Sequence, residues 1–231
     1  MSISEFDQFS DEYHQSLSQS IQFSGESPEY FHQYKVGDVL RSVPAATIRR
    51  ILDFGTGVGN SVPHLRLAYP DAELIAVDIS ARSLAVARER FPDAADFRQI
   101  DSPPLALPDA AFDVVFTACV FHHIPWPEHE AILKDLLRLL APGGRLFVFE
   151  HNPWNPLTQY VVNTCPFDRN ARLIPAPTLR RQVLRAGFSD VSVRYRVFFP
   201  HRLAWLRHWE HGLSAVPLGA QYAIEARRES P

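Results

Sequence analysis

Three aspartates stand at the ends of three successive apolar runs in the sequence. Asp53 lies near the end of "RILDF", Asp78 ends "ELIAVD", and Asp101 follows "DFRQI". They are separated by 25 and 23 residues, which is typical of one strand with one connection. Because the carboxyl ends of neighbouring parallel strands meet at one crevice, this spacing predicts that the three carboxylates converge.

Each of these carboxylates suits a different part of a nucleoside ligand. Asp78 can accept hydrogen bonds from both hydroxyls of a ribose, and Asp101 can accept one from an exocyclic adenine amine. Asp53 can stabilise an ammonium group or hold the adjacent turn. A single aspartate in such a place is often only a helix cap, but three in register on consecutive strands favour a binding site.

The segment "ILDFGTGVGN" carries glycines at positions 55, 57 and 59, directly after the first apolar run. A strand that ends in a glycine-rich turn and opens a helix forms a cradle for a polar or anionic ligand, because the backbone can approach the ligand closely. The phosphate-binding P-loop needs Lys and Ser or Thr after its last glycine, where this chain has "GNSV". The dinucleotide fingerprint needs a glycine where Asn60 stands. These departures argue against a phosphate-binding P-loop and against a dinucleotide-binding loop. A third alternative is a tight turn with only a structural role.

The elements that position these residues follow from the alternation of short apolar runs with amphipathic segments. Strands are predicted at "RILDF", "ELIAVD", "DFRQI", "FDVVFTA" and "GRLFVFE", with helices over residues 60–69, 81–90 and 128–140. This alternation predicts a parallel sheet covered by helices on both faces. Pro103, Pro104 and Pro108 leave little room for a helix between the third and fourth strands, so that connection is predicted to be short or irregular.

The two ends of the chain flank this sheet. Residues 1–43 are rich in aromatic side chains and contain a predicted helix from Pro28 to about Val43, which indicates an N-terminal helical cap. After "EHNPWNP" we expect a linker and then a helix at about 178–187. The runs "FSDVSVRYRVFF" and "AQYAIEARR" are predicted strands that can pair antiparallel, with an aromatic helical insert at 203–212 between them.

Composition argues against several classes of partner. The 231-residue chain has a formal charge of −3 and its Lys and Arg are spread along it, so nucleic acid and anionic membranes are not expected partners. No apolar run approaches the roughly 20 residues that span a bilayer. Cys119 and Cys165 form no CxxC or zinc-site pattern, and the first residues lack the features of a signal peptide. We therefore expect a cytoplasmic protein with a small-molecule partner.

In order, "ILDFGTGVGN", "AVDIS", "QIDS", "FDVVFTACVFHHI" and "LLRLLAPGGRLFVFEHN" resemble the successive motifs of class I S-adenosylmethionine (SAM)-dependent methyltransferases. The resemblance is to the small-molecule group that includes quinone-biosynthesis-like enzymes (methyltransferase type 11/12), and it covers about residues 28–151. It implies a Rossmann-like, seven-stranded, mostly parallel sheet with an antiparallel C-terminal hairpin and helices on both faces. A helical cap or lid of residues 1–43 would precede a SAM-binding methyltransferase domain of residues 44–231, with an aromatic insert at about 200–216.

The resemblance also implies roles for particular residues. The glycine loop and the end of the fourth strand would hold the methionine part of SAM, with Asp53 behind its amino group. Asp78 would bind the ribose, Ile79 would flank the adenine, and the residues after the third strand would meet the adenine edge. SAM has no pyrophosphate, so a GxGxG loop suffices and Asn60 is then a helix N-cap. The implied cofactor-binding residues are Asp53, Gly55, Gly57, Gly59, Asp78, Ile79, Asp101, Ser102, Thr117 and Ala118.

Methyl transfer from a sulfonium is an in-line displacement, which needs a base only when the acceptor atom carries a proton. The candidate bases are His123 in "FHHI" and His151 in "FEHNP", because imidazole titrates near neutral pH. Two alternatives stay open: the "HH" pair shapes the cofactor side of the pocket, or Glu150, His151 and another His hold a metal ion. We predict no metal. Cys119 is interpreted as a small buried apolar residue.

The predicted function is transfer of the SAM methyl group to an O, N or C nucleophile of a small organic molecule. Nucleobase substrates are disfavoured, because the fourth strand ends in "TACVFHH" rather than in Asn or an acidic residue before Pro-Pro-aromatic. Trp205 and Trp209 either pack on the sheet or form a lid over an aromatic or lipophilic acceptor. Tyr30, Tyr34 and Lys35 either reach the cofactor carboxylate or the acceptor, or dock the cap. The competing functions are an NAD(P)-type oxidoreductase and a SAM-binding protein without methyl transfer.

Overall fold

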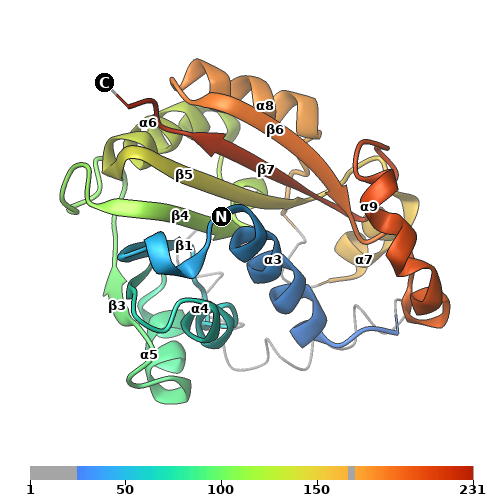
Figure 1. The fold of residues 1–231 in the computed structure, drawn as a ribbon, viewed down its shortest axis with the longest axis horizontal. Coiled ribbons are helices and arrows are strands. Elements are labelled where there is room, and N and C mark those ends of the chain that lie inside the picture. The colour runs from blue at the N-terminus through green and yellow to red at the C-terminus, as the bar shows by residue number, and fades with distance from the viewer. Residues whose placement is uncertain (1–24, 166–169, 231) are drawn as a thin grey trace.

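A seven-stranded sheet runs through the centre of the computed structural model, which describes residues 25–165 and 170–230 (Figure 1). The strand order is β3-β2-β1-β4-β5-β7-β6, in which β1 to β5 are parallel and β7 is antiparallel to both of its neighbours. This order confirms the predicted mostly parallel sheet with an antiparallel C-terminal hairpin. The strands are β1 (Arg50–Phe54), β2 (Glu73–Asp78), β3 (Asp96–Gln99), β4 (Phe112–Ala118), β5 (Leu140–His151), β6 (Ser189–Arg196) and β7 (Gln221–Arg227).

Helices cover both faces of this sheet, and each face has its own apolar core. One core joins α3, α4 and α5 to the sheet, and the other joins α6 and α8 to it. A fully buried leucine in either core, such as Leu65 or Leu136, contributes about 1.5–3 kcal/mol to stability. The α-helices are α3 (Pro28–Ser42), α4 (Val62–Ala68), α5 (Ala81–Arg90), α6 (His129–Leu139), α7 (Pro156–Thr164), α8 (Ala176–Arg185) and α9 (Glu210–Leu213), and the 3₁₀ helices are η2 (Ala45–Thr47), η3 (Phe121–His123), η4 (Trp126–Glu128) and η6 (His201–Trp209).

Local sequence signals explain where several helices begin. The Ser27 side chain accepts a hydrogen bond from the backbone N–H of Tyr30, and Pro28 occupies the first turn of α3. The Ser80 hydroxyl accepts a hydrogen bond from the N–H of Ser83 at 3.0 Å and so caps α5. The bounds of α3 and α5 therefore lie within one residue of the prediction, because their caps are local in the chain.

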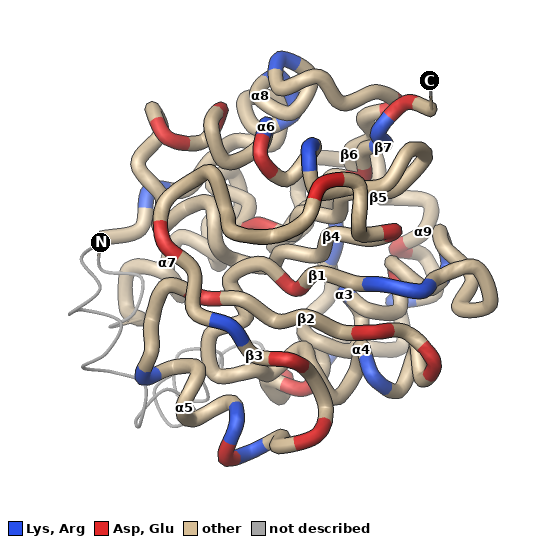
Figure 2. The backbone as a smooth tube through the Cα atoms, turned by 90° about the vertical axis from the view of Figure 1, so that its left-hand side faces the viewer, with Lys and Arg blue, Asp and Glu red and all other residues tan. Residues whose placement is uncertain are grey.

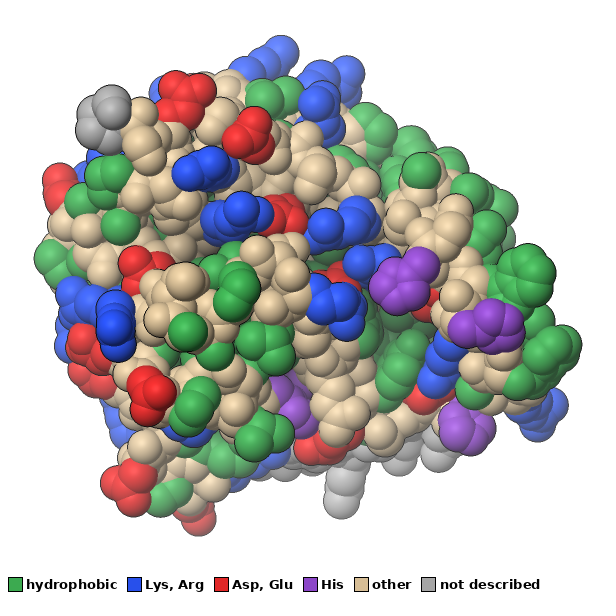
Figure 3. Space-filling view, in the orientation of Figure 1, with side chains coloured by type: hydrophobic (Ala, Val, Ile, Leu, Met, Phe, Trp, Pro, Cys, Tyr) green, Lys and Arg blue, Asp and Glu red, His purple; other side chains and the backbone are tan. Residues whose placement is uncertain are grey.

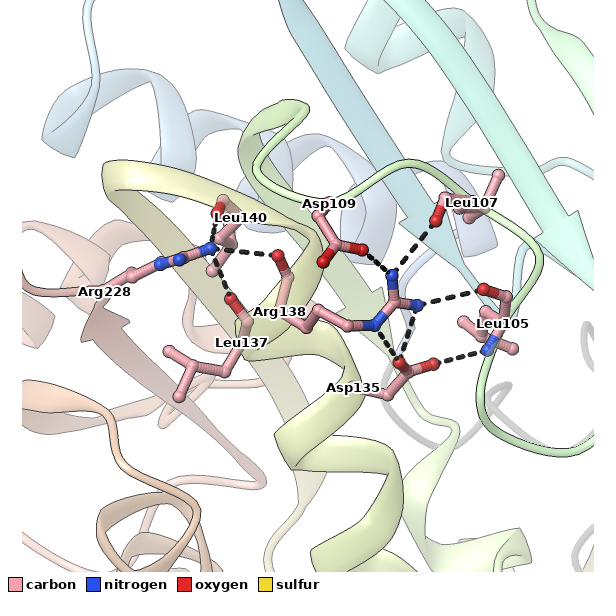
Figure 4. Close-up of polar contacts among 8 residues, drawn as sticks. All are labelled: Leu105, Leu107, Asp109, Asp135, Leu137, Arg138, Leu140 and Arg228. Carbon is pink, nitrogen blue, oxygen red and sulfur yellow. Dashed lines mark hydrogen bonds and ion pairs between the residues drawn. The ribbon is translucent and has the colours of Figure 1, made fainter.

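The connection between β3 and β4 contains no helix, as the three prolines predicted. It is held instead by Arg138 on α6, whose guanidinium donates to the carbonyls of Leu105 and Leu107 and pairs with Asp109 and Asp135 (Figure 4). The Asp135 carboxylate also accepts a hydrogen bond from the N–H of Leu105 at 2.6 Å. A charged pair on one helix thus replaces the hydrogen bonds that a helical connection would have made internally.

A second arginine closes the end of the same helix. The Arg228 guanidinium, beyond the end of β7, donates to the carbonyls of Leu137, Arg138 and Leu140 (Figure 4). Those carbonyls have no partner inside α6, and a cation at a helix C-terminus also offsets the helix dipole. The C-terminal strand is thereby joined to the helix that precedes β5.

The prediction of a linker after "EHNPWNP" is wrong, because this segment contains the helix α7. The Asn155 side chain accepts a hydrogen bond from the N–H of Thr158 at 3.0 Å, and Pro156 is the first helical residue. An N-cap asparagine followed by proline is a local helix-start signal that the sequence does contain.

The aromatic insert between β6 and β7 is helical, as predicted. It consists of the 3₁₀ helix η6 followed by the short α9. Trp205 and Trp209 are 70% and 63% exposed, so the interpretation that they pack on the sheet is wrong. The division into a cap of residues 1–43 and a domain of residues 44–231 remains a prediction, and residues 1–24 lie outside the described part of the chain.

The described surface mixes both signs of charge. Figure 2 shows Lys and Arg interspersed with Asp and Glu along the tube, and Figure 3 shows the same mixture on the face seen in Figure 1. Apolar and His side chains gather at the right of Figure 3, where η6 and α9 lie. Among the described helices, none has the length and apolar character needed to cross a membrane.

Candidate active site

The cavity that holds the predicted site lies where the strand order reverses. β1 has β2 on one side and β4 on the other, so the connections that leave β1 and β4 diverge and open a crevice at the carboxyl ends of the strands. A cavity of about 480 Å³ occupies this position and is lined by the glycine loop, the ends of β2 and β4, α3, α7 and the segment before η6. This volume is in the range of small-molecule sites.

Most of the predicted site residues meet in this one cavity. Gly59 and Thr117 do not line it, because Gly59 packs against Ala87 and Phe91 and the Thr117 side chain is buried in the sheet. The predicted residues that line the cavity are Asp53, Gly55, Gly57, Asp78, Ile79, Asp101, Ser102, Ala118, His123 and His151.

Two glycines of the loop have positive φ angles for different reasons. A Cβ on Gly55, at φ +75°, would lie 2.4 Å from a methyl group of Val120, so the loop and the β4 end could not approach each other with any larger residue. A Cβ on Gly57, at φ +54°, would meet no atom within 4 Å. Gly57 therefore leaves one side of the loop open to a ligand.

Asp78 holds the loop from the neighbouring strand. One carboxylate oxygen accepts a hydrogen bond from the N–H of Gly57 at 2.8 Å, and the other accepts one from the N–H of Ser80 at 2.9 Å. An ionised carboxylate has about four acceptor positions, so these two contacts are compatible with recognition of ribose hydroxyls by the same side chain.

Asp53 is a buried carboxyl at the base of the loop. It is 2% exposed and accepts a hydrogen bond from the Thr56 hydroxyl at 2.7 Å. Burial raises the pKa of Asp53 to about 7, the Thr56 hydrogen bond opposes the rise, and the nearby charge of Asp78 adds to it. A cationic group bound beside it would favour the ionised form.

Asn60 is not the helix N-cap that the sequence predicted. A tight turn, in which the N–H of Gly59 donates to the Thr56 carbonyl at 3.0 Å, delays the start of α4, and Ser61 is its N-cap residue. The Asn60 side chain instead accepts a hydrogen bond from Arg90 of α5 at 2.8 Å and lines the cavity.

Glu150, on β5, organises the chain that follows β4. One of its carboxylate oxygens accepts hydrogen bonds from the N–H groups of Val120 and Phe121, at 3.0 and 2.8 Å, and the other lies 2.5 Å from Nδ1 of His122. Burial raises the pKa of Glu150, but the adjacent His122 outweighs it and lowers the pKa below its ordinary value. Within residues 25–165 and 170–230, no three His, Cys, Asp or Glu side chains are grouped so as to hold a metal ion.

The two candidate bases both lie against the His122 ring. The His123 ring packs on that of His122 with 4.1 Å between centroids, and the His151 ring is 5.2 Å from the same ring. His151 is the last residue of β5, and its Nδ1 lies 3.4 Å from the Gln221 side-chain amide. Both imidazoles line the cavity.

Cys119 is not the small buried apolar residue that was predicted. It is partly exposed, lines the cavity and has a φ of +60°. Lys35 of α3 donates a hydrogen bond to its sulfur at 3.5 Å. Burial raises the pKa of the Cys119 thiol, but Lys35 and His151 together outweigh this effect and lower it to about 7. The position of Lys35 agrees with the open alternative that a cap residue reaches the site, whereas Tyr34 bonds to Gln221 and Tyr30 packs under Arg207.

One wall of the cavity was not predicted from the sequence. It comes from α7 and consists of Leu157, Thr158, Val161 and Cys165. The spacing of positions 157, 161 and 165 places them on one face of a helix, and together with "NP" before them it is the signal that could have predicted this wall.

Fold and site together define a Rossmann-like protein with a cavity at the switch point of its sheet, which is where sheets of this kind bind nucleotide ligands. A family model described as a methyltransferase domain matches residues 51–144. A trans-aconitate 2-methyltransferase of Methylobacterium nodulans is 33% identical over 83% of this chain and 78% of its own length. A demethylmenaquinone methyltransferase of Thermus thermophilus is 38% identical over 46% of this chain and 48% of its own. A crystal structure of a SAM-dependent methyltransferase from Thermotoga maritima shares the fold, with a TM-score of 0.71, 20% identity and coverage of 99% of this chain and 100% of that one.

The chain therefore belongs to the class I SAM-dependent methyltransferases. SAM is its cofactor, and the oxidoreductase alternative is not favoured. The loop fits this cofactor, because the open side of Gly57 leaves room for it and the buried Asp53 carboxyl would be stabilised by its ammonium group. When bound, SAM supplies an electrophilic methyl group on a sulfonium.

Proposed function

We propose that this methyltransferase acts on a small, mainly apolar acceptor that carries at most one negative charge. The observation that supports this proposal is the composition of the cavity wall outside the glycine loop. Much of that wall is apolar, with Phe31 from α3, Ile124 after η3, Leu157 and Val161 from α7, and Phe198 before η6. The acidic residues that line it are Glu26 and Glu128, which also disfavour an acceptor with several negative charges. Lys35 is the one Lys or Arg among the described residues that line the cavity.

For the cofactor, we propose that Asp78 accepts the ribose hydroxyls, that Asp101 with Ser102 meets the adenine edge and that Ile79 packs on the adenine. The shared position of these residues along one cavity supports this assignment. We assign the methionine part to the residues of the glycine loop and of the end of β4 that line the cavity, which are Asp53, Gly55, Gly57 and Ala118. Gly59 and Thr117 do not line it, so we assign them to the packing behind the loop and the strand.

We propose His151 as the group that takes a proton from the acceptor, with His123 as the alternative. His151 stands at the end of β5, and its Nδ1 lies 3.4 Å from Nε2 of Gln221. Its position at the cavity wall beside the segment that follows β4 supports a role next to the reacting atoms.

We further infer that the N-terminal residues 1–43 and the insert at about 200–216 enclose the acceptor, and that the enzyme works in the cytoplasm. Phe31 of α3 and Pro200 before η6 line the cavity, which supports the first inference. Neither Cys119 nor Cys165 takes part in a disulfide, which agrees with a reducing compartment.

Trans-aconitate is a second candidate acceptor, because a relative with that name matches most of this chain. Its three carboxylates would meet a described cavity wall with one lysine, so we rank it below an apolar acceptor.

The test measures transfer of radiolabelled methyl groups from SAM to a panel of phenols, hydroxyquinones, aromatic amines and trans-aconitate. Faster transfer to an uncharged or singly charged aromatic acceptor supports the proposal. Preference for trans-aconitate replaces it with the second candidate. Binding of S-adenosylhomocysteine by calorimetry without transfer to any of these compounds contradicts the proposed acceptor class.

A further inference from the structure

Two side chains from different elements, Lys35 and His151, lie beside the thiol of Cys119. The thiol follows β4, the Lys35 ammonium reaches it from α3 at 3.5 Å, and His151 reaches it from the end of β5. Cys119 and Lys35 are 84 residues apart in the chain, so this contact exists only in the folded protein.

The burial of Lys35 indicates which form of the thiol the site favours. Lys35 is 3% exposed, and among the ion pairs of the described residues none joins its ammonium to a carboxylate. A buried ammonium group is costly unless an anion or strong acceptor lies beside it. The group that lies beside it is the Cys119 sulfur, and a thiolate satisfies that requirement.

Other charged and titratable groups also face the thiol. Tyr34 comes from α3, Glu150 from β5 and Tyr222 from β7. Burial and Glu150 raise the pKa of Cys119, whereas Lys35 and His151 lower it, and the balance favours the anion.

The backbone holds the thiol in a defined position. The N–H of Cys119 donates to the Phe149 carbonyl at 2.8 Å, and the next two N–H groups donate to Glu150. Its φ of +60° is uncommon for a residue with a side chain, and it turns the chain immediately after β4. The sulfur is therefore fixed at the wall of the cavity, where a molecule inside the cavity can reach it.

We propose that Cys119 is a nucleophilic thiol and a covalent modification site for soft carbon electrophiles that fit the cavity, namely enones, quinones and maleimides. The thiolate sulfur adds to the β-carbon of the electrophile, the π pair moves to the carbonyl oxygen, and the enolate takes a proton from solvent. One C–S bond forms, no group leaves, and no oxidant or reductant is needed. The thioether occupies the space beside Ala118 and excludes ligands from the cavity. This site does not depend on the identity of the methyl acceptor.

Cys165 provides an internal control. It lines the same cavity at the end of α7 but is buried, whereas Cys119 is partly exposed. The two thiols therefore open on the same cavity but differ in exposure, so the Lys35 variants decide whether the ammonium group contributes to the reactivity of Cys119.

The experiment follows the rate at which N-ethylmaleimide modifies each cysteine, by intact mass and peptide mapping, between pH 5.5 and 9. A thiol with a pKa near 7 is roughly one-quarter ionised at pH 6.5, whereas one with an ordinary pKa of about 8.5 is roughly one-hundredth ionised. We expect Cys119 to react at least about tenfold faster than Cys165 at pH 6.5, with a midpoint near 7. S-adenosylhomocysteine should slow the reaction.

Three variants separate the cause of this reactivity from simple exposure. Cys165→Ser should leave the rate unchanged, Lys35→Met should move the midpoint upward and slow modification at pH 6.5 several-fold, and Lys35→Arg should restore most of it. Equal rates at Cys119 and Cys165 in the unmodified protein would overturn the proposal whatever the variants do. So would a Lys35→Met protein with a native circular dichroism spectrum and an unchanged midpoint. Because no methyl acceptor is used, failure here is distinct from failure of the proposed function.

Discussion

The carboxylate of Asp78 accepts a hydrogen bond from the backbone N–H of Gly57 at 2.8 Å. The residue proposed to bind the ribose is thus also the residue that fixes the glycine loop. Under that assignment, positioning of the loop and recognition of the cofactor are coupled through one side chain.

Replacing Asp78 with Ala should weaken binding of S-adenosylhomocysteine by about 1.5–3 kcal/mol, which is the range for hydrogen bonds to a charged group. Asp78→Asn should lose less binding free energy, because the amide oxygen can still accept the hydrogen bond from the N–H of Gly57. Calorimetry measures both. Asp101→Ala is the matched comparison at the exposed adenine edge, and unchanged affinity in Asp78→Ala would refute the ribose assignment.

The buried Asp53 should make the ligand-free protein less stable as the pH rises. Its pKa is raised in the fold from 3.8 to about 7, so between these values the folded state holds a proton that the unfolded state has lost. Stability from this group therefore falls from pH 4 to pH 7. The Asp53→Asn variant lacks this dependence on pH. The difference in melting temperature, variant minus unmodified protein, should therefore increase as the pH rises from 4 to 7. A constant difference between the two proteins would contradict the assignment.

Breaking the Glu150–His122 pair should be costly. Glu150→Gln removes the buried negative charge beside His122 and weakens the hydrogen bonds from the N–H groups of Val120 and Phe121. We therefore expect the free energy of unfolding in urea to fall by about 3 kcal/mol at pH 7. The pKa of Glu150 is lowered in the fold, so its contribution is present above its unfolded pKa of 4.5 and is lost as the pH falls below that value. The difference between the two proteins should accordingly shrink at low pH, and a gap that persists there would argue for a packing defect.

His151→Ala should lower turnover about 100-fold with an acceptor that carries a proton, while affinity for S-adenosylhomocysteine stays nearly unchanged. His123→Ala tests the alternative base, because its imidazole lines the same cavity and also packs on the His122 ring. If the His151→Ala enzyme keeps its turnover across the pH range, His151 is not the base.

Arg138→Ala should destabilise the helix-free connection between β3 and β4 by about 1–3 kcal/mol, because four groups of that segment and α6 lose a charged donor. Lys134→Ala on the same helix is the control, since the Lys134–Glu130 pair is exposed and should have little effect. Urea unfolding of both variants gives the comparison, and equal midpoints would show that the network is dispensable.

Much of the fold and of the cofactor side of the site was predictable, because the signals are local. The strand ends at Asp53 and Asp78 follow from apolar runs of five and six residues, and the loop follows from the glycines between them. The α7 helix was not predicted, although the "NP" pair and the apolar residues at helical spacing after it indicate a helix. That error came from the interpretation of the sequence and not from a missing local signal. Asn60 was assigned wrongly for a physical reason, since its partner Arg90 is 30 residues away on another helix.

By itself, the sequence determined the order of strands and helices, the parallel sheet and the carboxylates that meet at its switch point, since the period of apolar residues and the turn chemistry act over a few neighbouring positions. Tertiary structure alone decided that Lys35 meets Cys119, that Glu150 pairs with His122 and that Trp205 and Trp209 face outward. Those outcomes depend on burial and on charges brought together across 28 to 84 residues, and no local pattern encodes such distances.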